Sequence, residues 1–175
     1  ADFRIGCAVW AYKEWLGEFY PTGSRPTNFL RLYGERMTCV EGNTTFYSIP
    51  TPETVKRWAD NTPSSFRFCP KLPRTVTHGS ELMPQLSDAL DFLTLMQGLG
   101  EKLGPIFAQL PPRYSPRLLP DLAQFIESWP HHVSPLAVEV RHLDWFKPPH
   151  SDQLNRLLPR CGVGRVLLDT RPIST

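Results

Sequence analysis

Residues 105–109 read Pro-Ile-Phe-Ala-Gln, and residues 136–139 read Leu-Ala-Val-Glu. Both are short, nearly continuous apolar runs that end in a polar side chain, a pattern typical of parallel strands covered on both faces. Between them, apolar residues of 118–129 recur at spacings of 4, 3 and 4, which is the period of a helix with one buried face. This strand–helix–strand unit predicts a parallel α/β sheet with right-handed crossovers.

The same unit repeats along the chain, with strand starts 28 to 39 residues apart. Eight such units would take about 260 residues, the size of a (β/α)8 barrel, whereas this chain of 175 residues holds about six. The sequence therefore predicts one α/β domain over residues 1–175, either an open doubly wound sheet or a barrel that lacks its last two units. The expected strands are 3–8, 38–41, 66–70, 105–109, 136–139 and 165–169, and the expected helices lie near 27–35, 52–59, 86–96, 118–129 and 151–158.

Two helix starts carry recognisable capping residues. Thr51 precedes Pro52, which places a capping hydroxyl before a proline at the first helical position. Ser151 and Asp152 are expected to cap the last helix, and Pro159 is expected to end it.

The composition is that of an ordinary globular protein, with 41% hydrophobic and 21% charged residues. The net charge of +2 is too small to argue for nucleic-acid binding on bulk charge. No apolar run approaches the ~20 residues of a membrane span, and the four cysteines include no Cys-x-x-Cys pair. We therefore expect reduced, buried cysteines and a cytoplasmic protein that does not act at a membrane.

Polar and aromatic side chains follow nearly every expected strand. Because ligands of parallel α/β folds bind at the carboxyl ends of the strands, we expect these side chains to surround one site. In chain order they are Trp10 and Tyr12; Glu41, Asn43, Thr45, Phe46 and Tyr47; Lys71, Arg74 and His78; Gln109; Glu139, Arg141 and His142; and Asp169 and Arg171.

These residue types suit acid/base chemistry on a small polar or anionic molecule, with a phosphate or carboxylate held by Lys71 and Arg141. Glu41 and Glu139 are the candidate general acids or bases. Asn43, Gln109 and Asp169 would orient the ligand, and the aromatic side chains would wall the pocket. The predicted catalytic residues are Glu41, Glu139, Lys71 and Asp169. The predicted ligand-binding residues are Trp10, Tyr12, Asn43, Thr45, Phe46, Tyr47, His78, Gln109, Arg141 and His142.

Other interpretations of the same residues remain open. The carboxylates and cations could neutralise one another as a structural network, or simply be solvated strand ends. The site could bind a nucleotide, a nucleic-acid end or a protein partner without catalysis. A divalent metal that cleaves phosphoesters is a less favoured alternative, because no His-x-His or His-x-x-x-His spacing supports it. No cofactor is expected, and no residue is assigned as a metal ligand.

Several motifs together resemble the YecE-like family, a domain family of unknown function. The stretch Ile5-Gly6-Cys7-Ala8 with Trp10, Tyr12 and Trp15 resembles the first motif of the family. The stretch Glu41-Gly42-Asn43-Thr44-Thr45-Phe46-Tyr47 resembles its second motif. Lys71 with His78, Gln109-Leu110-Pro111-Pro112, and Val138-Glu139-Val140-Arg141-His142 resemble later motifs. Cys7 and Cys39 depart from the family pattern and are interpreted as tolerated apolar positions. The resemblance covers the whole chain.

The resemblance implies a TIM-type (β/α)8 barrel, here truncated after about six β/α units. Asp169-Thr170-Arg171-Pro172 resembles the exit of the sixth strand. A barrel without two units leaves two strand edges unpaired, so we expect them to be covered by further chain or by a second copy in an oligomer. Barrels of this type include hydrolases and isomerases, which is an analogy of fold and not of chemistry.

Overall fold

The computed structural model describes residues 3–169 of the chain, in which short parallel strands alternate with helices. The strands are β1 (Cys39–Gly42), β2 (Arg67–Pro70), β3 (Ile106–Gln109), β4 (Leu136–Glu139) and β5 (Gly164–Arg165). The helices are α1 (Phe29–Gly34), α2 (Thr44–Tyr47), α3 (Pro52–Asp60), α4 (Arg74–Thr77), α5 (Leu86–Met96), α6 (Leu119–Ser128) and α7 (His150–Arg160).

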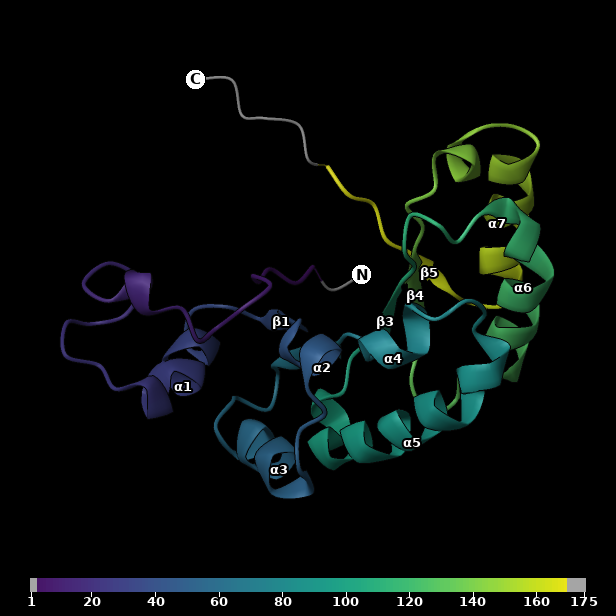
Figure 1. Ribbon diagram of the computed structural model, residues 1–175. Helices are drawn as coiled ribbons and strands as arrows, with labels where there is room; N and C mark the ends of the chain where they lie inside the picture. The colour runs from purple at the N-terminus through teal and green to yellow at the C-terminus, as the bar shows by residue number, and fades with distance from the viewer. Residues whose placement is uncertain (1–2, 170–175) are drawn as a thin grey trace, which may run out of the picture.

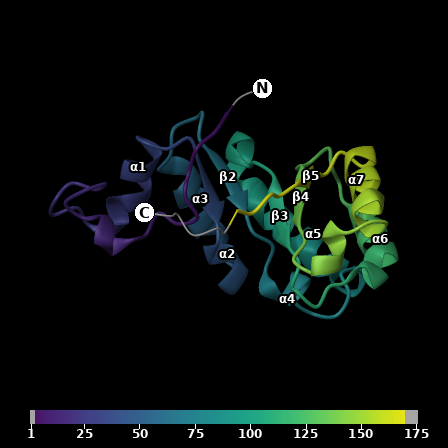
Figure 2. The same ribbon diagram turned by 90° about the horizontal axis from the view of Figure 1, so that it is seen from above.

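The strands pair in chain order and in parallel. β1 pairs with β2, and β3 pairs with β4, which pairs with β5. The two groups are joined where Gly104 N donates to Phe68 O at 2.7 Å and Leu72 N donates to Phe107 O at 2.9 Å. Helices α3, α5, α6 and α7 form an arc on the outer side of these strands (Figures 1 and 2).

The parallel α/β architecture predicted from the repeat is confirmed over the four middle strands. The alternation of buried and partly exposed residues along β1 and β2 shows why these strands form here. Val40 and Phe68 point outward into the core beneath the helices, while Glu41 and Cys69 face inward. The core thus lies between the strands and the outer helices, and the inner face is lined mainly by small and apolar side chains such as Cys69 and Phe107, with Glu41 among them.

The predicted first strand, residues 3–8, is wrong. This segment lies beside β1, where Ile5 O accepts from Thr38 N at 3.0 Å and Cys7 O accepts from Glu41 N at 3.0 Å. Its own donors go to side chains instead, because Ile5 N bonds the Thr38 hydroxyl and Cys7 N bonds the Tyr33 hydroxyl. Side-chain oxygens have therefore replaced half of the ladder, and no strand is assigned.

The predicted sixth strand, residues 165–169, is also largely wrong. β5 covers only Gly164–Arg165, and one further bond, Val166 N to Val138 O at 2.9 Å, extends the pairing. Leu167 beyond it is 83% exposed. The apolar run after Val166 lies beside no further strand of the described chain, which explains why its β pattern is not realised. Residues 170–175, which include the predicted exit residue Arg171, lie outside the described residues.

The helix predictions hold with small shifts. The Thr51 hydroxyl accepts from Thr54 N at 3.3 Å with Pro52 in the first turn, as expected for α3. α7 begins at His150 without a side-chain cap from Ser151 or Asp152 and contains Pro159 near its end, both contrary to expectation. No helix within residues 3–169 has the length and apolarity needed to cross a bilayer.

Candidate functional site

Four strand ends bring their polar side chains to the inner face of the fold. Glu41 lies on β1, Lys71 directly follows β2, and Gln109 and Glu139 end β3 and β4 as register partners. The Lys71 ammonium lies 4.0 Å from the Glu41 carboxylate, and Gln109 Nε2 donates to both Glu139 oxygens at 3.1 and 3.3 Å. The predicted convergence of these four residues is therefore observed, and we call this place the mouth.

Lys71 is held in an enclosed position, with a side chain only 8% exposed. Its Nζ donates to Asn43 Oδ1 at 3.0 Å and lies 4.9 Å from the ring centre of Phe46 and 5.3 Å from that of Phe107. Ring faces attract a cation at such distances. Burial lowers the pKa of Lys71, which the negative charge of Glu41 partly opposes.

Glu41 is the accessible carboxylate of the mouth, with 39% of its side chain exposed. Burial of the remainder raises the pKa of Glu41, Lys71 lowers it, and the nearby Glu139 raises it further. A carboxyl group with a raised pKa beside an ammonium can accept or donate a proton nearer neutral pH than an ordinary glutamate.

Glu139 has a different environment, because its side chain is only 5% exposed. Besides the two contacts from Gln109, it accepts a hydrogen bond from Arg141 Nε at 2.6 Å. Arg141 is 40% exposed and reaches out from the mouth. The Glu139 carboxylate therefore fixes the position of the Arg141 guanidinium.

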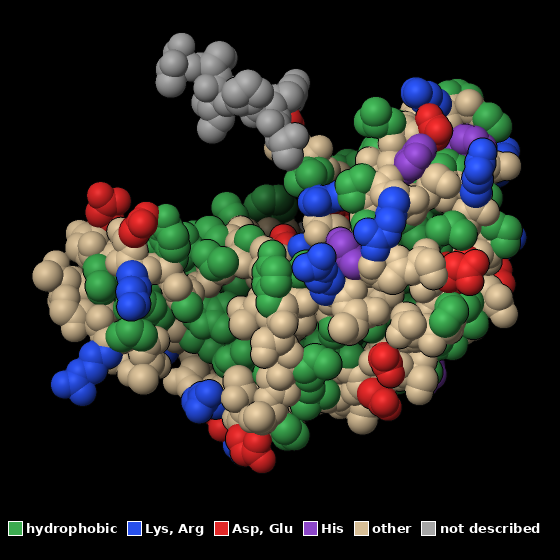
Figure 3. All heavy atoms as spheres, viewed as in Figure 1, with side chains coloured by type: hydrophobic (Ala, Val, Ile, Leu, Met, Phe, Trp, Pro, Cys, Tyr) green, Lys and Arg blue, Asp and Glu red, His purple; other side chains and the backbone are tan. Residues whose placement is uncertain are grey.

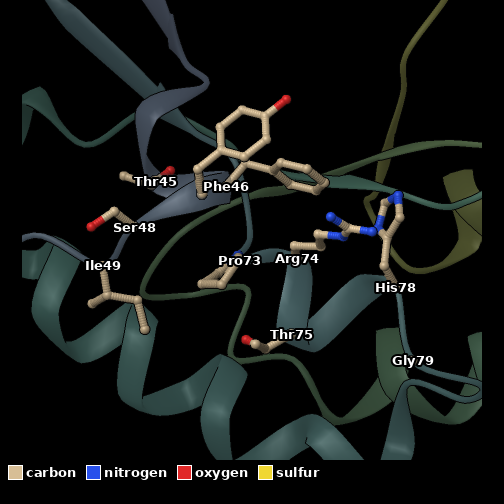
Figure 4. Close-up of a pocket in the computed structure, with 10 residues that line it drawn as sticks. Thr45, Phe46, Ser48, Ile49, Pro73, Arg74, Thr75, His78 and Gly79 are labelled. Atoms are coloured by element: carbon tan, nitrogen blue, oxygen red, sulfur yellow. The ribbon is translucent and has the colours of Figure 1, made fainter.

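A group of basic side chains borders the mouth. Arg74 and His78 lie side by side at the start and end of the α4 segment (Figure 4). Burial lowers the pKa of His78, and the positive charges of Arg113, Arg74, Lys71 and Arg141 lower it further. Figure 3 shows Lys and Arg side chains gathered around a His on this face. The mouth is thus adjacent to an electropositive rim.

A pocket of about 760 Å³ opens next to the mouth. Phe46, Tyr47, Ile49 and Pro73 supply apolar walls, and Arg74 and His78 lie at one end (Figure 4). Phe46 belongs to both sites, since its ring centre lies 4.9 Å from Lys71 Nζ and 5.0 Å from the His78 ring. Ile49 and Pro73 were not predicted as site residues, and the signal for Ile49 is an exposed apolar residue in the turn before Pro50.

Three of the predicted residues make their contacts away from the mouth. The Trp10 ring packs edge-on against Trp58 at 5.3 Å, on the outer side of the strands near α3. The Tyr12 hydroxyl donates to Glu14, and His142 Nδ1 accepts from Asp144 N at 3.2 Å to begin a short 3-10 turn. Asp169 lies on the exposed segment that follows β5. The printed contacts of Trp10, Tyr12 and His142 are thus with residues outside the mouth.

Thr45 lies at the site, but its hydroxyl contacts backbone carbonyl groups. Its buried hydroxyl lies 2.7 Å from Gly42 O and 2.6 Å from Lys71 O, so it links the ends of β1 and β2. Tyr47, by contrast, is 80% exposed and contributes its ring to the pocket. Within residues 3–169, no group of three or more His, Cys, Asp and Glu side chains is arranged to hold a metal ion.

Comparison with known proteins identifies relatives over nearly the whole chain. The family described as "Protein of unknown function DUF72" matches residues 4–175. The UPF0759 protein YecE of Escherichia coli K12 is 39% identical over 170 residues, which are 97% of this chain and 60% of the relative. The UPF0759 protein YunF of Bacillus subtilis 168 is 24% identical over 157 residues, 85% of this chain and 54% of the relative. The chain thus spans about 60% of the length of the YecE protein that it matches.

Two solved structures share the fold. A DUF72 family protein from Thermotoga maritima MSB8 superposes with a TM-score of 0.71 and 23% identity, over 95% of this chain and 64% of that chain. A DUF72 family protein from Enterococcus faecalis V583 gives a TM-score of 0.69 at 19% identity, over 93% of this chain and 59% of that chain. The family match over residues 4–175 and the identity to YecE together show that the chain belongs to the DUF72 family of proteins of unknown function.

Proposed function

We propose that this protein is an enzyme that binds a small anionic substrate at the mouth and transfers a proton through Glu41. The observation that carries the proposal is the pairing of an accessible carboxylate with an enclosed ammonium 4.0 Å away. Two such groups with pKa values moved toward each other form an acid/base pair suited to catalysis near neutral pH.

The charges around the mouth favour an anion. Two carboxylates, Glu41 and Glu139, are accompanied by four cations that all lower the pKa of His78. The four cations are Lys71, Arg74, Arg113 and Arg141. Such a group of cations attracts and orients a phosphate or carboxylate.

The two glutamates have separate roles in this proposal. Glu41 is the proton-transferring group, because more than a third of its side chain is exposed. Glu139 is a positioning residue that directs the guanidinium of Arg141 toward the anion through the 2.6 Å bond to Nε. Asn43 and Gln109 hold Lys71 and Glu139 in place through their amide groups.

Binding of inorganic phosphate, measured by calorimetric titration, tests the anion site. Arg141→Gln should weaken binding about tenfold, which corresponds to the loss of one charge-assisted contact. Arg160→Gln is the matched control, because Arg160 also pairs with a glutamate, Glu127, at 2.8 Å but on the exposed surface. Lys71→Met keeps the apolar stem between the two rings and should weaken binding at least as much.

A purely structural charge network gives the opposite result. In that case Arg141→Gln and Lys71→Met would change the free energy of unfolding while phosphate bound the wild type and the variants alike. The proposal would also fail if phosphate and small carboxylates did not bind the wild-type protein.

We further infer that the described strands are part of one closed (β/α)8-barrel domain. Support comes from the parallel order β1 to β5 and from a cavity of about 380 Å³ on the inner face, lined by Cys7, Glu41, Cys69 and Phe107 among others. A chain extended to the length of the curated relatives should melt at a higher temperature than this one. Equal melting temperatures would contradict the inference.

A further inference from the structure

The pocket beside the mouth has no role in the proton transfer proposed above, yet its lining is specific. One end carries Arg74 and His78, and the other carries Ser48 and Ile49 (Figure 4). Its volume of about 760 Å³ lies within the range of pockets that enclose small organic ligands. Cationic and neutral ends in one pocket match a ligand with one charged and one uncharged part.

The neutral part of the pocket has aromatic walls. The Phe46 and Tyr47 rings are 5.0 Å apart and nearly perpendicular, at 89°. Phe46 is buried by its contacts with Lys71 and His78, whereas Tyr47 is 80% exposed and its removal would leave the core unchanged. An exposed aromatic ring at the edge of an apolar pocket is a platform on which a flat ring can stack.

Two hydroxyl groups complete the neutral part. Ser48 and Thr75 both line the pocket, from the turn after α2 and from within α4 respectively. Hydroxyls both donate and accept hydrogen bonds, so they can pair with the ring nitrogens and exocyclic groups of a heterocyclic base.

The charged end favours a phosphate over a singly charged group. The charges of Arg74, Lys71 and Arg141 all act on His78, whose ring lies 5.0 Å from the Phe46 ring. Several cations near one end of the pocket suit the charge of a phosphate monoester, about −1.5 to −2 at neutral pH. An arginine fork also fits phosphate oxygens in pairs.

We propose that the substrate is a nucleoside monophosphate, whose base stacks on Tyr47 in the pocket and whose phosphate lies between Arg74 and the mouth. This inference rests on the proposed function for the position of the phosphate and adds the identity of the rest of the molecule. The base stays in the pocket while Glu41 transfers a proton to or from the part of the ligand nearest to Lys71.

The test is calorimetric titration with adenosine 5′-monophosphate, uridine 5′-monophosphate, ribose 5-phosphate and adenosine. At least one nucleotide should bind about tenfold more tightly than ribose 5-phosphate, within the range that stacking a base on an aromatic side chain provides. Adenosine, which lacks the phosphate, should bind more weakly than its nucleotide.

Two variants assign the parts of the ligand. Tyr47→Ala should reduce nucleotide binding about tenfold and leave ribose 5-phosphate binding unchanged. Phe3→Ala is the control, because it removes an exposed aromatic ring that is far from Tyr47 in the sequence. It should change neither nucleotide binding nor ribose 5-phosphate binding. Arg74→Gln should weaken both phosphates, and Arg31→Gln, on the exposed surface of α1, should weaken neither.

The outcomes separate this inference from the proposed function. Equal affinity for the nucleotides and ribose 5-phosphate, or nucleotide binding that is unaffected by Tyr47→Ala, would overturn the assignment of the base while the anion site remained. If none of the three phosphates bound, both the inference and the proposed function would be overturned.

Discussion

Arg141 Nε donates a 2.6 Å hydrogen bond to the Glu139 carboxylate, although the two residues are separated by Val140 alone. Residues two apart on an extended chain project to the same side, so β4 and its extension present both side chains to the mouth. Glu139 is enclosed and Arg141 is accessible. The pair therefore places a fixed guanidinium at the surface of the site by means of a carboxylate beneath it.

Glu139→Gln should lower the free energy of unfolding by about 1.5–3 kcal/mol, the range for hydrogen bonds to charged groups. The neutral amide can still contact Gln109 but no longer attracts Arg141 by charge. Urea unfolding measures the change. Glu127→Gln is the control, because its exposed bond to Arg160 should contribute less than about 1 kcal/mol. Equal losses in the two variants would show that burial gives the Glu139 pair no additional strength.

Glu41→Gln should stabilise the fold at neutral pH. Because the pKa of Glu41 is raised in the folded state, its contribution to stability is fully present below the ordinary value of 4.5 and is lost as pH rises through the folded pKa. Glutamine does not ionise, so the Glu41→Gln variant does not lose this stability as pH rises. Its advantage at pH 7 should be less than about 1 kcal/mol, because water screens a side chain that is more than a third exposed.

The pH profile of thermal unfolding tests this sign. The difference between Glu41→Gln and wild type should disappear below pH 4.5. Glu53→Gln is the comparison with opposite sign, since hydrogen bonds at the start of α3 lower the pKa of Glu53. That variant should be less stable than wild type at neutral pH, and the difference should vanish as pH falls. A destabilised Glu41→Gln at pH 7 would mean that attraction to Lys71 outweighs the cost of burial.

Thr45→Val should cost about 1–3 kcal/mol, because it leaves buried carbonyl groups of Gly42 and Lys71 without the hydroxyl that joins them. Chemical unfolding measures the cost. Thr94→Val is the matched control, since its exposed hydroxyl bonds only its own helix at Leu90 O and should change stability by less than about 0.5 kcal/mol. If both substitutions were neutral, Thr45 would not be the link between the ends of β1 and β2.

The mouth was predictable from the sequence because period and strand polarity are local signals. Once β1 to β4 are parallel, the residues that end them must share one edge, and this places Glu41, Lys71, Gln109 and Glu139 together. The sequence pattern did not indicate that Lys71 Nζ would lie near the rings of both Phe46 and Phe107. These two rings come from different strand–helix units, and a local pattern does not show which units are neighbours.

The errors of prediction arise where tertiary contacts override the pattern. Trp10 was expected at the mouth because it follows an apolar run, but its ring packs against Trp58 and Phe68 on the outer side instead. Phe46, Tyr47 and His78 of the pocket were predicted as ligand-binding residues, but Ile49 and Pro73 were not, because they belong to the turn before Pro50 and to the segment after Lys71. These loops meet only when β1 and β2 are adjacent.

The N-terminal segment supplies the last prediction, which depends on Gly6. A Cβ atom at this position would lie 1.9 Å from Cys39 O and 3.0 Å from the Tyr33 hydroxyl. Gly6→Ala should therefore push residues 3–9 away from β1 and break the bonds from Glu41 N to Cys7 O and from Cys7 N to Tyr33. We expect a loss of about 1–3 kcal/mol on urea unfolding, the usual cost of overpacking.

Hydrogen exchange tests whether this loss comes from the segment itself. In Gly6→Ala the amides of Cys39 and Glu41, which bond Ile5 O and Cys7 O, should exchange faster, while those in β4 should not change. Gly79→Ala is the control, because no atom lies within 4 Å of a Cβ there. Unchanged protection of Glu41 in Gly6→Ala would mean that the segment can shift without leaving β1. Release of the segment would free the carboxylate of Glu41 to move, so the same variant should also weaken its coupling to Lys71.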